Sequence, residues 1–436
     1  VAHIARSPES FPCFIIVYMS HNLYVKNIGK VATPKGNKAI HGKAMGELDI
    51  LMGPAAIVIR DGIIAYVGKE SEVPGDLIQD CAVYDAQGGA VVPGFVDSHT
   101  HLVFGGFREE EFQMRLRGAS YMSIMQAGGG IASTTKATRE ASVEELEAAA
   151  QVHLRAMLSM GVTTADAKSG YGMDLETELR QLEVIRRLQK SQPIALHATF
   201  MGAHDTPPEF KGRSTDYIEY LVQTVLPEVK SRGLAECCDI FTEEGVFDHE
   251  QTRRLLNAAR ALGFSLKMHA DEIVPFGGAE LAAELGCLSA DHLLQISEKG
   301  IAALANSNTV ATLLPCTAFS LKAAYAPARK MIDNGCAVAV ASDLNPGSCF
   351  SASIPLMYDL ACIYMGMTAE ETLTALTLNG AAAIGRADRI GSIEVGKEGD
   401  LVVLGYPCYK FLSYHIGMNI VHSTIKGGAV YTNHID

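Results

Sequence analysis

The chain reads Val91-Val92-Pro93-Gly94-Phe95-Val96-Asp97-Ser98-His99-Thr100-His101, an apolar run that ends in two histidines separated by one residue. Such a run predicts a buried strand. Residues i and i+2 of a strand point to the same side, so His99 and His101 are expected next to each other at its carboxyl end. Two imidazoles placed in this way can share one metal ion. Taken alone, the motif is equally compatible with a pair of solvated histidines.

Eight apolar runs of this kind alternate with segments of helical periodicity. The helical segments carry start signals, such as Ser142 followed by Glu145, a capping box that predicts a helix over 143–160. Continuous apolar strands that each precede a helix predict an α/β fold, a closed parallel (β/α)₈ TIM barrel, because its strands are buried on both faces. The eight runs are 90–96, 162–167, 194–200, 238–242, 264–269, 288–292, 309–314 and 336–342.

Both ends of the chain have the pattern of short β-strands. Segments 56–60 and 63–68 flank the turn pair Asp61-Gly62 and predict a hairpin, and similar strands return at 400–404 and 423–431. We expect one small β-sandwich built from residues 19–87 and 386–436, with the barrel over 88–385. Because the chain begins with Val1 and strand alternation starts after Met19, residues 1–18 are expected to be a non-native or mis-called extension.

Composition narrows the classes of partner. The chain has 36 Lys and Arg against 49 Asp and Glu, a net charge of −13, which disfavours nucleic acid because such binding depends on clustered basic residues. Since no apolar stretch approaches the roughly 18 residues that span a bilayer, no membrane partner is expected. The ten cysteines are scattered without a CxxC motif, which is typical of a reducing compartment and predicts a cytoplasmic location.

Three further predicted strand ends finish in side chains that bind metals. They are His269 with Asp271 and Glu272, His292 after Asp291, and Asp343 after Ser342. In a parallel barrel these ends meet on one face, the face that carries active sites. Three histidines and one aspartate around an open position suit Zn²⁺ or iron better than Cu(I) or Mg²⁺.

This arrangement of Pro-Gly-Phe-Val-Asp-Ser-His-Thr-His, a later His-x-x-Glu, and a His and an Asp on the sixth and eighth strands resembles the amidohydrolase superfamily. The resemblance runs from about Asn22 to the C-terminus and is sharpest to the members that hydrolyse the cyclic amide of 4-imidazolone-5-propanoate. Five segments carry it: Gly105-Gly106-Phe107-Arg108-Glu109-Glu110-Glu111-Phe112, Gly128-Gly129-Gly130-Ile131, Lys168-Ser169-Gly170-Tyr171-Gly172, Met201-Gly202-Ala203-His204 and Ser342-Asp343-Leu344-Asn345-Pro346-Gly347-Ser348.

The resemblance implies one Zn²⁺ or Fe³⁺ per chain, and a homodimer. A single ion is favoured because the fourth strand ends in Glu243 and offers no lysine for a second ion. The implied metal ligands are His99, His101, His269 and Asp343, and the implied substrate contacts are Arg108, Tyr171, His204, Glu272, Asn345, Gly347 and Ser348.

The same resemblance implies how the ring amide is opened to N-formimidoyl-L-glutamate. Asp343 or His292 accepts a proton from the attacking water, and Glu272 protonates the leaving ring nitrogen. Arg108 grips the propanoate carboxylate with two parallel hydrogen bonds.

Three alternatives stay open. Arg108 sits beside Glu109, Glu110 and Glu111 and could belong to a surface ion-pair network. The scaffold could carry a deaminase of another nitrogen heterocycle, which would release ammonia. It could also be a non-catalytic scaffold protein, against which the complete set of metal ligands argues.

Overall fold

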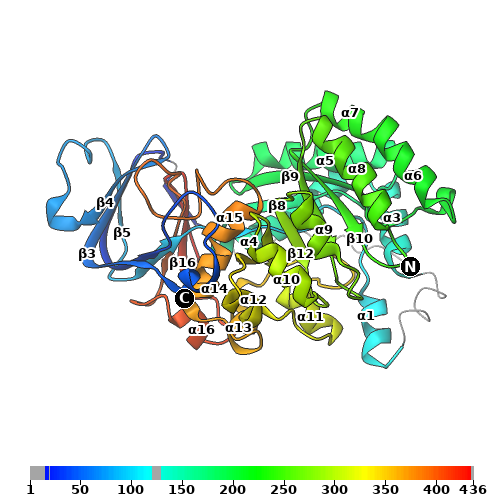
Figure 1. The fold of residues 1–436 in the computed structure, drawn as a ribbon. Helices are drawn as coiled ribbons and strands as arrows, with labels where there is room; N and C mark the ends of the chain where they lie inside the picture. Colours follow the sequence, from blue (N-terminus) through cyan, green and yellow to red (C-terminus); the bar gives the residue numbers. More distant parts are fainter. Residues whose placement is uncertain (1–14, 19, 120–128, 434–436) are drawn as a thin grey trace.

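The computed structural model describes residues 15–18, 20–119 and 129–433, and within them eight strands form one parallel sheet (Figure 1). Its first and last strands meet through the parallel bridge Thr100–Leu344, and the His101 amide donates to the Leu344 carbonyl at 2.9 Å. The predicted TIM barrel is therefore confirmed. Its strands are β7 (Phe95–Asp97), β8 (Val162–Lys168), β9 (Ala195–Ala203), β10 (Cys237–Thr242), β11 (Ser265–Ala270), β12 (Ser289–His292), β13 (Val310–Leu313) and β14 (Val338–Val340).

Helices surround these strands and bury their outer faces (Figure 1). The predicted capping box is present, since Ser142 accepts from the Glu145 amide at the start of a helix that ends at Ser159. The helices are α1 (Glu109–Leu116), α3 (Ile131–Glu140), α4 (Val143–Ser159), α5 (Leu175–Ser191), α6 (Ser214–Tyr220), α7 (Leu226–Ser231), α8 (His249–Ala261), α9 (Gly278–Glu284), α10 (Glu298–Ala305), α11 (Pro315–Leu321), α12 (Ala328–Asp333), α13 (Ile354–Ile363), α14 (Ala369–Leu376), α15 (Leu378–Ala383) and α16 (Phe411–Tyr414).

A second sheet combines strands from the two ends of the chain, at the left of Figure 1. Its core takes residues from both ends, including Val25, Ile57, Leu401 and Ile425. The predicted hairpin is β3–β4, joined at Asp61 and Gly62, which both have positive φ. The strands are β1 (Ile15–Tyr18), β2 (Leu23–Thr33), β3 (Asp49–Arg60), β4 (Ile63–Lys69), β5 (Ala82–Asp85), β6 (Ala90–Pro93), β15 (Leu401–Leu404), β16 (Val421–Lys426) and β17 (Ala429–Thr432).

The first predicted barrel run, 90–96, is divided between the two sheets. Residues Ala90–Pro93 form β6, which pairs with β15 in the second sheet, and the barrel begins only at Phe95. Gly94 makes the crossing, where a Cβ atom would lie 2.3 Å from the Thr163 hydroxyl. One continuous strand was therefore the wrong prediction here, because the chain changes sheet at Pro93-Gly94, where Thr163 leaves room only for a glycine.

Part of the predicted N-terminal extension, residues 1–14, lies outside the described residues, as do Met19 and Gly128. Residues Ile15–Tyr18 form β1, which pairs antiparallel with β17.

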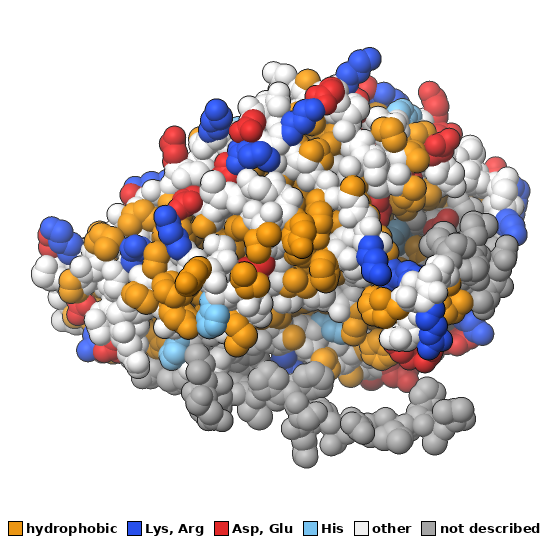
Figure 2. All heavy atoms as spheres, turned by 90° about the horizontal axis from the view of Figure 1, so that it is seen from below, with side chains coloured by type: hydrophobic (Ala, Val, Ile, Leu, Met, Phe, Trp, Pro, Cys, Tyr) orange, Lys and Arg blue, Asp and Glu red, His pale blue; other side chains and the backbone are white. Residues whose placement is uncertain are grey.

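The surface mixes charges of both signs. Along the upper edge of Figure 2, Lys and Arg side chains alternate with Asp and Glu. Over the described ranges, no helix is long and apolar enough to cross a membrane.

Candidate functional site

The ends of four barrel strands bring the predicted metal-binding side chains together. His99 and His101 follow β7, His269 lies on β11, and His292 ends β12. The His99 ring centroid is 4.5 Å from that of His269, 5.3 Å from that of His101 and 5.4 Å from that of His292. Asp343 follows β14, and its Oδ1 lies 3.5 Å from His99 Nε2 and 3.8 Å from His101 Nε2.

These groups fit a metal ion. One ligand atom from each of His99, His101 and Asp343 lies within 4.8 Å of the others, and the same holds for His99, His269 and His292. Ligands about 2.0–2.1 Å from a tetrahedral ion are separated by about 3.3 Å, close to the 3.5 and 3.8 Å between Asp343 Oδ1 and the Nε2 atoms of His99 and His101. Among the described residues, the buried Nε2 atoms of His99 and His269 have no hydrogen-bond partner. A cation accepting these lone pairs would satisfy them.

His99, His101 and His292 are in the neutral form, which can bind metals. Burial, together with the Lys168 charge, holds the pKa of His99 well below its usual range. Burial and His204 lower the pKa of His101, and burial and His269 lower that of His292. The three imidazoles are therefore neutral at pH 7, as coordination through a ring nitrogen requires.

Backbone strain accompanies these strand ends. Asp271, His292 and Asp343 have φ values of 49°, 78° and 53°, in the left-handed region. Such residues cost about 1–3 kcal/mol each and persist where the surrounding structure holds them. The Asp343 amide donates a 3.0 Å hydrogen bond to the His99 carbonyl. The segment after the first barrel strand therefore fixes the turn that follows the last one.

A cluster of buried charges that sequence reasoning missed lies next to the histidines. This buried charge cluster consists of Asp166, Lys168, Asp239, Lys267 and Asp291. Lys168 Nζ lies 2.7 Å from Asp239 and 2.9 Å from Asp166, and Lys267 Nζ lies 2.9 Å from Asp166. A signal was available: a charged residue within a strand buried on both faces must find a buried partner of opposite charge.

Electrostatics keep Lys168 and Asp239 ionised, whereas burial raises the pKa of Asp291. Burial lowers the pKa of Lys168, but Asp166, Asp239 and Asp291 outweigh this effect and raise it well above its usual range. Burial raises the pKa of Asp239, but the Lys168 charge outweighs it and the pKa falls below its usual range.

A cavity of about 540 Å³ lies next to the metal-binding groups, at the carboxyl ends of the barrel strands. Apart from His99, which is fully buried, every predicted site residue lines it. Those that line it are His101, Arg108, Tyr171, His204, His269, Glu272, His292, Asp343, Asn345, Gly347 and Ser348.

Glu272 is a carboxylic acid at neutral pH in this cavity. Burial, with the nearby charges of Asp343 and Glu243, raises the pKa of Glu272 to about 8. Its Oε2 lies 3.5 Å from His292 Nδ1. The buried Glu243 carboxylate accepts from the Glu272 and Ile273 amides at 3.0 and 2.9 Å and so fixes the turn that carries Glu272. Burial also raises the pKa of Asp343 to about 6.

Arg108 forms an ion pair, as the alternative of a surface ion-pair network predicted, but the pair lies in the wall of the cavity. Its Nε and Nη2 lie 2.9 and 2.8 Å from Glu111 Oε2. The guanidinium also packs on Gly347, where a Cβ atom would lie 2.0 Å from Arg108 Nη1. Arg115 donates to the Gly347 carbonyl at 2.9 Å. Sequence reasoning gave Arg115 no part in the site.

Tyr171 and His204 form the wall next to His101. The His204 ring stacks on that of His101 with centroids 4.9 Å apart, and the Tyr171 ring lies 5.7 Å from it. Burial and His269 lower the pKa of His204 to about 3. Asn345 shapes the opposite loop, since its Oδ1 accepts from the Gly347 and Ser348 amides at 2.8 Å.

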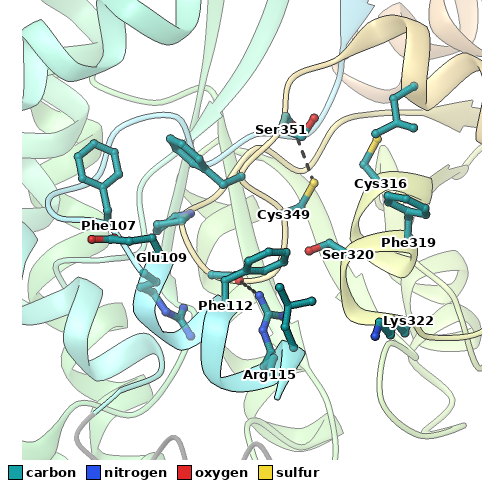
Figure 3. Close-up of a pocket in the computed structure, with 16 residues that line it drawn as sticks. Phe107, Glu109, Phe112, Arg115, Cys316, Phe319, Ser320, Lys322, Cys349 and Ser351 are labelled. Atoms are coloured by element: carbon teal, nitrogen blue, oxygen red, sulfur yellow. Dashed lines mark hydrogen bonds between the residues drawn. The ribbon is translucent and has the colours of Figure 1, made fainter. Parts of the chain in front are cut away.

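A second cavity, of about 730 Å³, lies beyond Arg108, Arg115 and Gly347, which line both cavities. Figure 3 shows this cavity between α1, which carries Phe112, and α11, which carries Phe319. Its Cys349 is buried and donates to the Ser342 and Ser351 carbonyls. The neighbouring Cys316 thiol and burial raise the pKa of Cys349 well above its usual range, so it is not a thiolate nucleophile.

Histidines and an aspartate at the carboxyl ends of TIM-barrel strands define a metal-dependent hydrolase. In agreement with this class, residues 90–430 match the amidohydrolase family. The chain is 70% identical to the imidazolonepropionase of Porphyromonas gingivalis, over 94% of this chain and 98% of that one. It is 57% identical to the imidazolonepropionase of Parabacteroides distasonis, over the same shares. The chain therefore belongs to the imidazolonepropionases of the amidohydrolase family.

A solved structure agrees on the fold alone. Guanine deaminase of E. coli is 16% identical and superposes with a TM-score of 0.70, over 94% of this chain and 99% of that one.

Proposed function

We propose that this chain hydrolyses the ring amide of 4-imidazolone-5-propanoate to N-formimidoyl-L-glutamate, a step of histidine degradation. The observation that carries the proposal is the content of one cavity. The cavity is lined by metal-binding groups, by a protonated Glu272 and by Arg108, whose guanidinium can bind a carboxylate. A cyclic amide with a carboxylate tail requires these three functions. The family relatives support the same substrate.

We infer that His99, His101, His269 and Asp343 hold one Zn²⁺ or Fe³⁺. Imidazole and carboxylate donors suit both ions. An ion bound here lowers the pKa of a water molecule from 15.7 towards about 7 and so supplies a nucleophile at neutral pH.

Asp343 and His292 are the groups placed to take the proton from the attacking water. Both line the cavity, and His292 is neutral, so its imidazole can accept a proton. Thr317 donates to Asp343 Oδ2 at 2.6 Å, which leaves Oδ1 facing the histidines.

Glu272 protonates the ring nitrogen that leaves when the amide bond breaks. A carboxyl group with a pKa of about 8 carries its proton at neutral pH and can donate it. The Glu243 carboxylate holds the Glu272 backbone in place for this transfer.

Arg108 and Tyr171 bind the propanoate tail. Glu111 engages Nε and Nη2 of Arg108, so Nη1, the nitrogen nearest Gly347, is the one that we propose faces the carboxylate. Glu111 also accepts from the Gly130 amide at 3.1 Å, which ties α3 to this wall. His204, Asn345, Gly347 and Ser348 complete the substrate contacts.

The test is turnover of 4-imidazolone-5-propanoate by the metal-loaded chain, followed by loss of imidazolone absorbance. We expect Arg108→Met to raise KM, and Arg117→Met, an exposed arginine just after α1, to leave it unchanged. Absence of turnover, with ammonia release from an aminoheterocycle instead, would reassign the chain to a deaminase.

We also propose that the chain forms a homodimer, as the family resemblance implies, and that it is located in the cytoplasm, as its scattered cysteines suggest. Gel filtration with light scattering tests the first, and fractionation of cells that express the chain natively tests the second.

A further inference from the structure

The buried charge cluster is connected to two proposed metal ligands. Asp239 Oδ1 lies 3.2 Å from His269 Nδ1, and Asp291 Oδ2 lies 2.6 Å from His99 Nδ1. A carboxylate can only accept hydrogen bonds, so each Nδ1 carries its hydrogen and each Nε2 keeps its lone pair. The two aspartates therefore set the tautomer and the ring direction of these histidines.

Lys168 joins these two aspartates. Its Nζ lies 2.7 Å from Asp239 Oδ2 and 3.6 Å from Asp291 Oδ2. Each carboxylate thus faces the ammonium while it also faces one histidine. Lys267 makes a different connection, since its Nζ donates to the Ser98 carbonyl at 2.8 Å, one residue before His99.

Lys168 also compensates part of the negative charge of the cluster. Within the described part of the chain, its three carboxylates face the two ammonium groups of Lys168 and Lys267, and all five side chains are fully buried. Three carboxylates against two ammonium groups give the cluster a formal charge of one negative, next to the place where a cation is proposed. Asp239, His269 and Asp291 also lie close enough together to hold an ion of their own, and the Lys168 ammonium stands beside two of these three groups.

We propose that Lys168 is a positioning residue of the metal centre. It holds Asp239 and Asp291 so that each fixes one histidine, and it thereby turns Nε2 of His269 and His99 towards the shared ion. The inference rests on the metal centre of the proposed function. It concerns the affinity for the metal and is independent of the substrate.

The experiment measures zinc affinity of the full metal-stripped chain by competition with a chromophoric chelator. Lys168→Met is expected to weaken zinc binding by about 10- to 100-fold, the usual effect of removing a group that orients metal ligands. The matched control is Lys426→Met, which removes a largely buried lysine paired with Asp400 at 2.6 Å in the other sheet. The control is expected to bind zinc within about twofold of the unmodified chain, because a lysine outside the site positions no ligand. Circular dichroism and thermal unfolding establish that each variant is folded.

A folded Lys168→Met chain that binds zinc as tightly as the Lys426→Met control would overturn the proposal. If Lys168→Met does not fold, the double variant Lys168→Met/Asp239→Asn, which removes one charge of each sign, is compared with Asp239→Asn alone. The double variant is expected to bind zinc more weakly than the single one, because Asp291 has then lost the ammonium group that lies 3.6 Å from its Oδ2. Equal affinities would show that Lys168 contributes only charge balance, and the proposal would be wrong.

Failure of this inference is distinct from failure of the proposed function. The first shows as unchanged zinc affinity of the Lys168 variants. The second shows as a chain that binds zinc tightly and does not turn over imidazolone propanoate.

Discussion

A methyl group added at Gly347 tests how the proposed carboxylate-binding site is built. In Gly347→Ala, the new Cβ would lie 2.0 Å from Arg108 Nη1 and 2.8 Å from its Cζ. Ordinary contact needs about 3.5 Å, so the guanidinium has to retreat by about 1.5 Å. Since the end of a flexible side chain can move at little cost, we expect the melting temperature to change by less than about 2 °C.

The displaced guanidinium loses its grip on the propanoate. A hydrogen bond to a charged group contributes about 1.5–3 kcal/mol. At about 1.36 kcal/mol per factor of ten, kcat/KM should fall about 10- to 150-fold, mainly through KM. Steady-state kinetics on imidazolone propanoate measure this. Gly75→Ala is the control, because nothing lies within 4 Å of a Cβ atom there.

A double-mutant cycle separates an effect through Arg108 from a direct clash of the methyl group with substrate. If the effect passes through Arg108, adding Gly347→Ala to Arg108→Met should change kcat/KM by less than about twofold, because the two effects are not additive. Full additivity, or unchanged kinetics of Gly347→Ala alone, would refute the reasoning.

Three further predictions concern the acid and the metal. Activity should fall as the pH rises through about 8, because Glu272 must keep its proton. Glu272→Gln should lower kcat by about 10²–10⁴-fold and should abolish this loss of activity at high pH. His99→Ala should reduce bound metal from about one ion per chain to almost none by elemental analysis, and exposed His21→Ala should retain it. Returning zinc to the stripped chain at about 100 times its Kd should stabilise it by about 2.7 kcal/mol in denaturant unfolding, and an unchanged midpoint would contradict a metal centre that forms on folding.

The metal-binding motif was predictable because its information is local. His99 and His101 follow an apolar run directly, and strand geometry alone places them together. Arrangement in a barrel then placed His269, His292 and Asp343 on the same face, since every parallel strand ends there. The strand boundary at Gly94 was missed although Pro93-Gly94 is a dipeptide typical of turns; what the sequence does not show is which sheet each half of the run joins, because the pairing partners, β15 and β8, are distant in sequence.

The groups behind the ligands needed the three-dimensional structure. Asp166 and Lys168 are two residues apart on β8, so this pair could have been read from the sequence, but Asp239 on β10 and Asp291 on β12 meet Lys168 only across the barrel. Sequence spacing indicates that such charges must be paired but does not identify the partner. Arg108 shows the same limit, since the sequence posed ion pair and substrate contact as alternatives and the structure gives Arg108 both an ion pair and a place in the cavity wall.

The sheet built from both ends of the chain has a consequence for biosynthesis. β6 pairs with β2 on one side and with β15 on the other, and β15 begins only at Leu401. While the ribosome makes the barrel, the β15 side of β6 has no partner. An unpaired strand edge is a template for aggregation, so a nascent chain that stalls before Leu401 exposes this hazard until it is shielded or degraded. Chains truncated before Leu401 are therefore expected to aggregate more readily than chains that include β15.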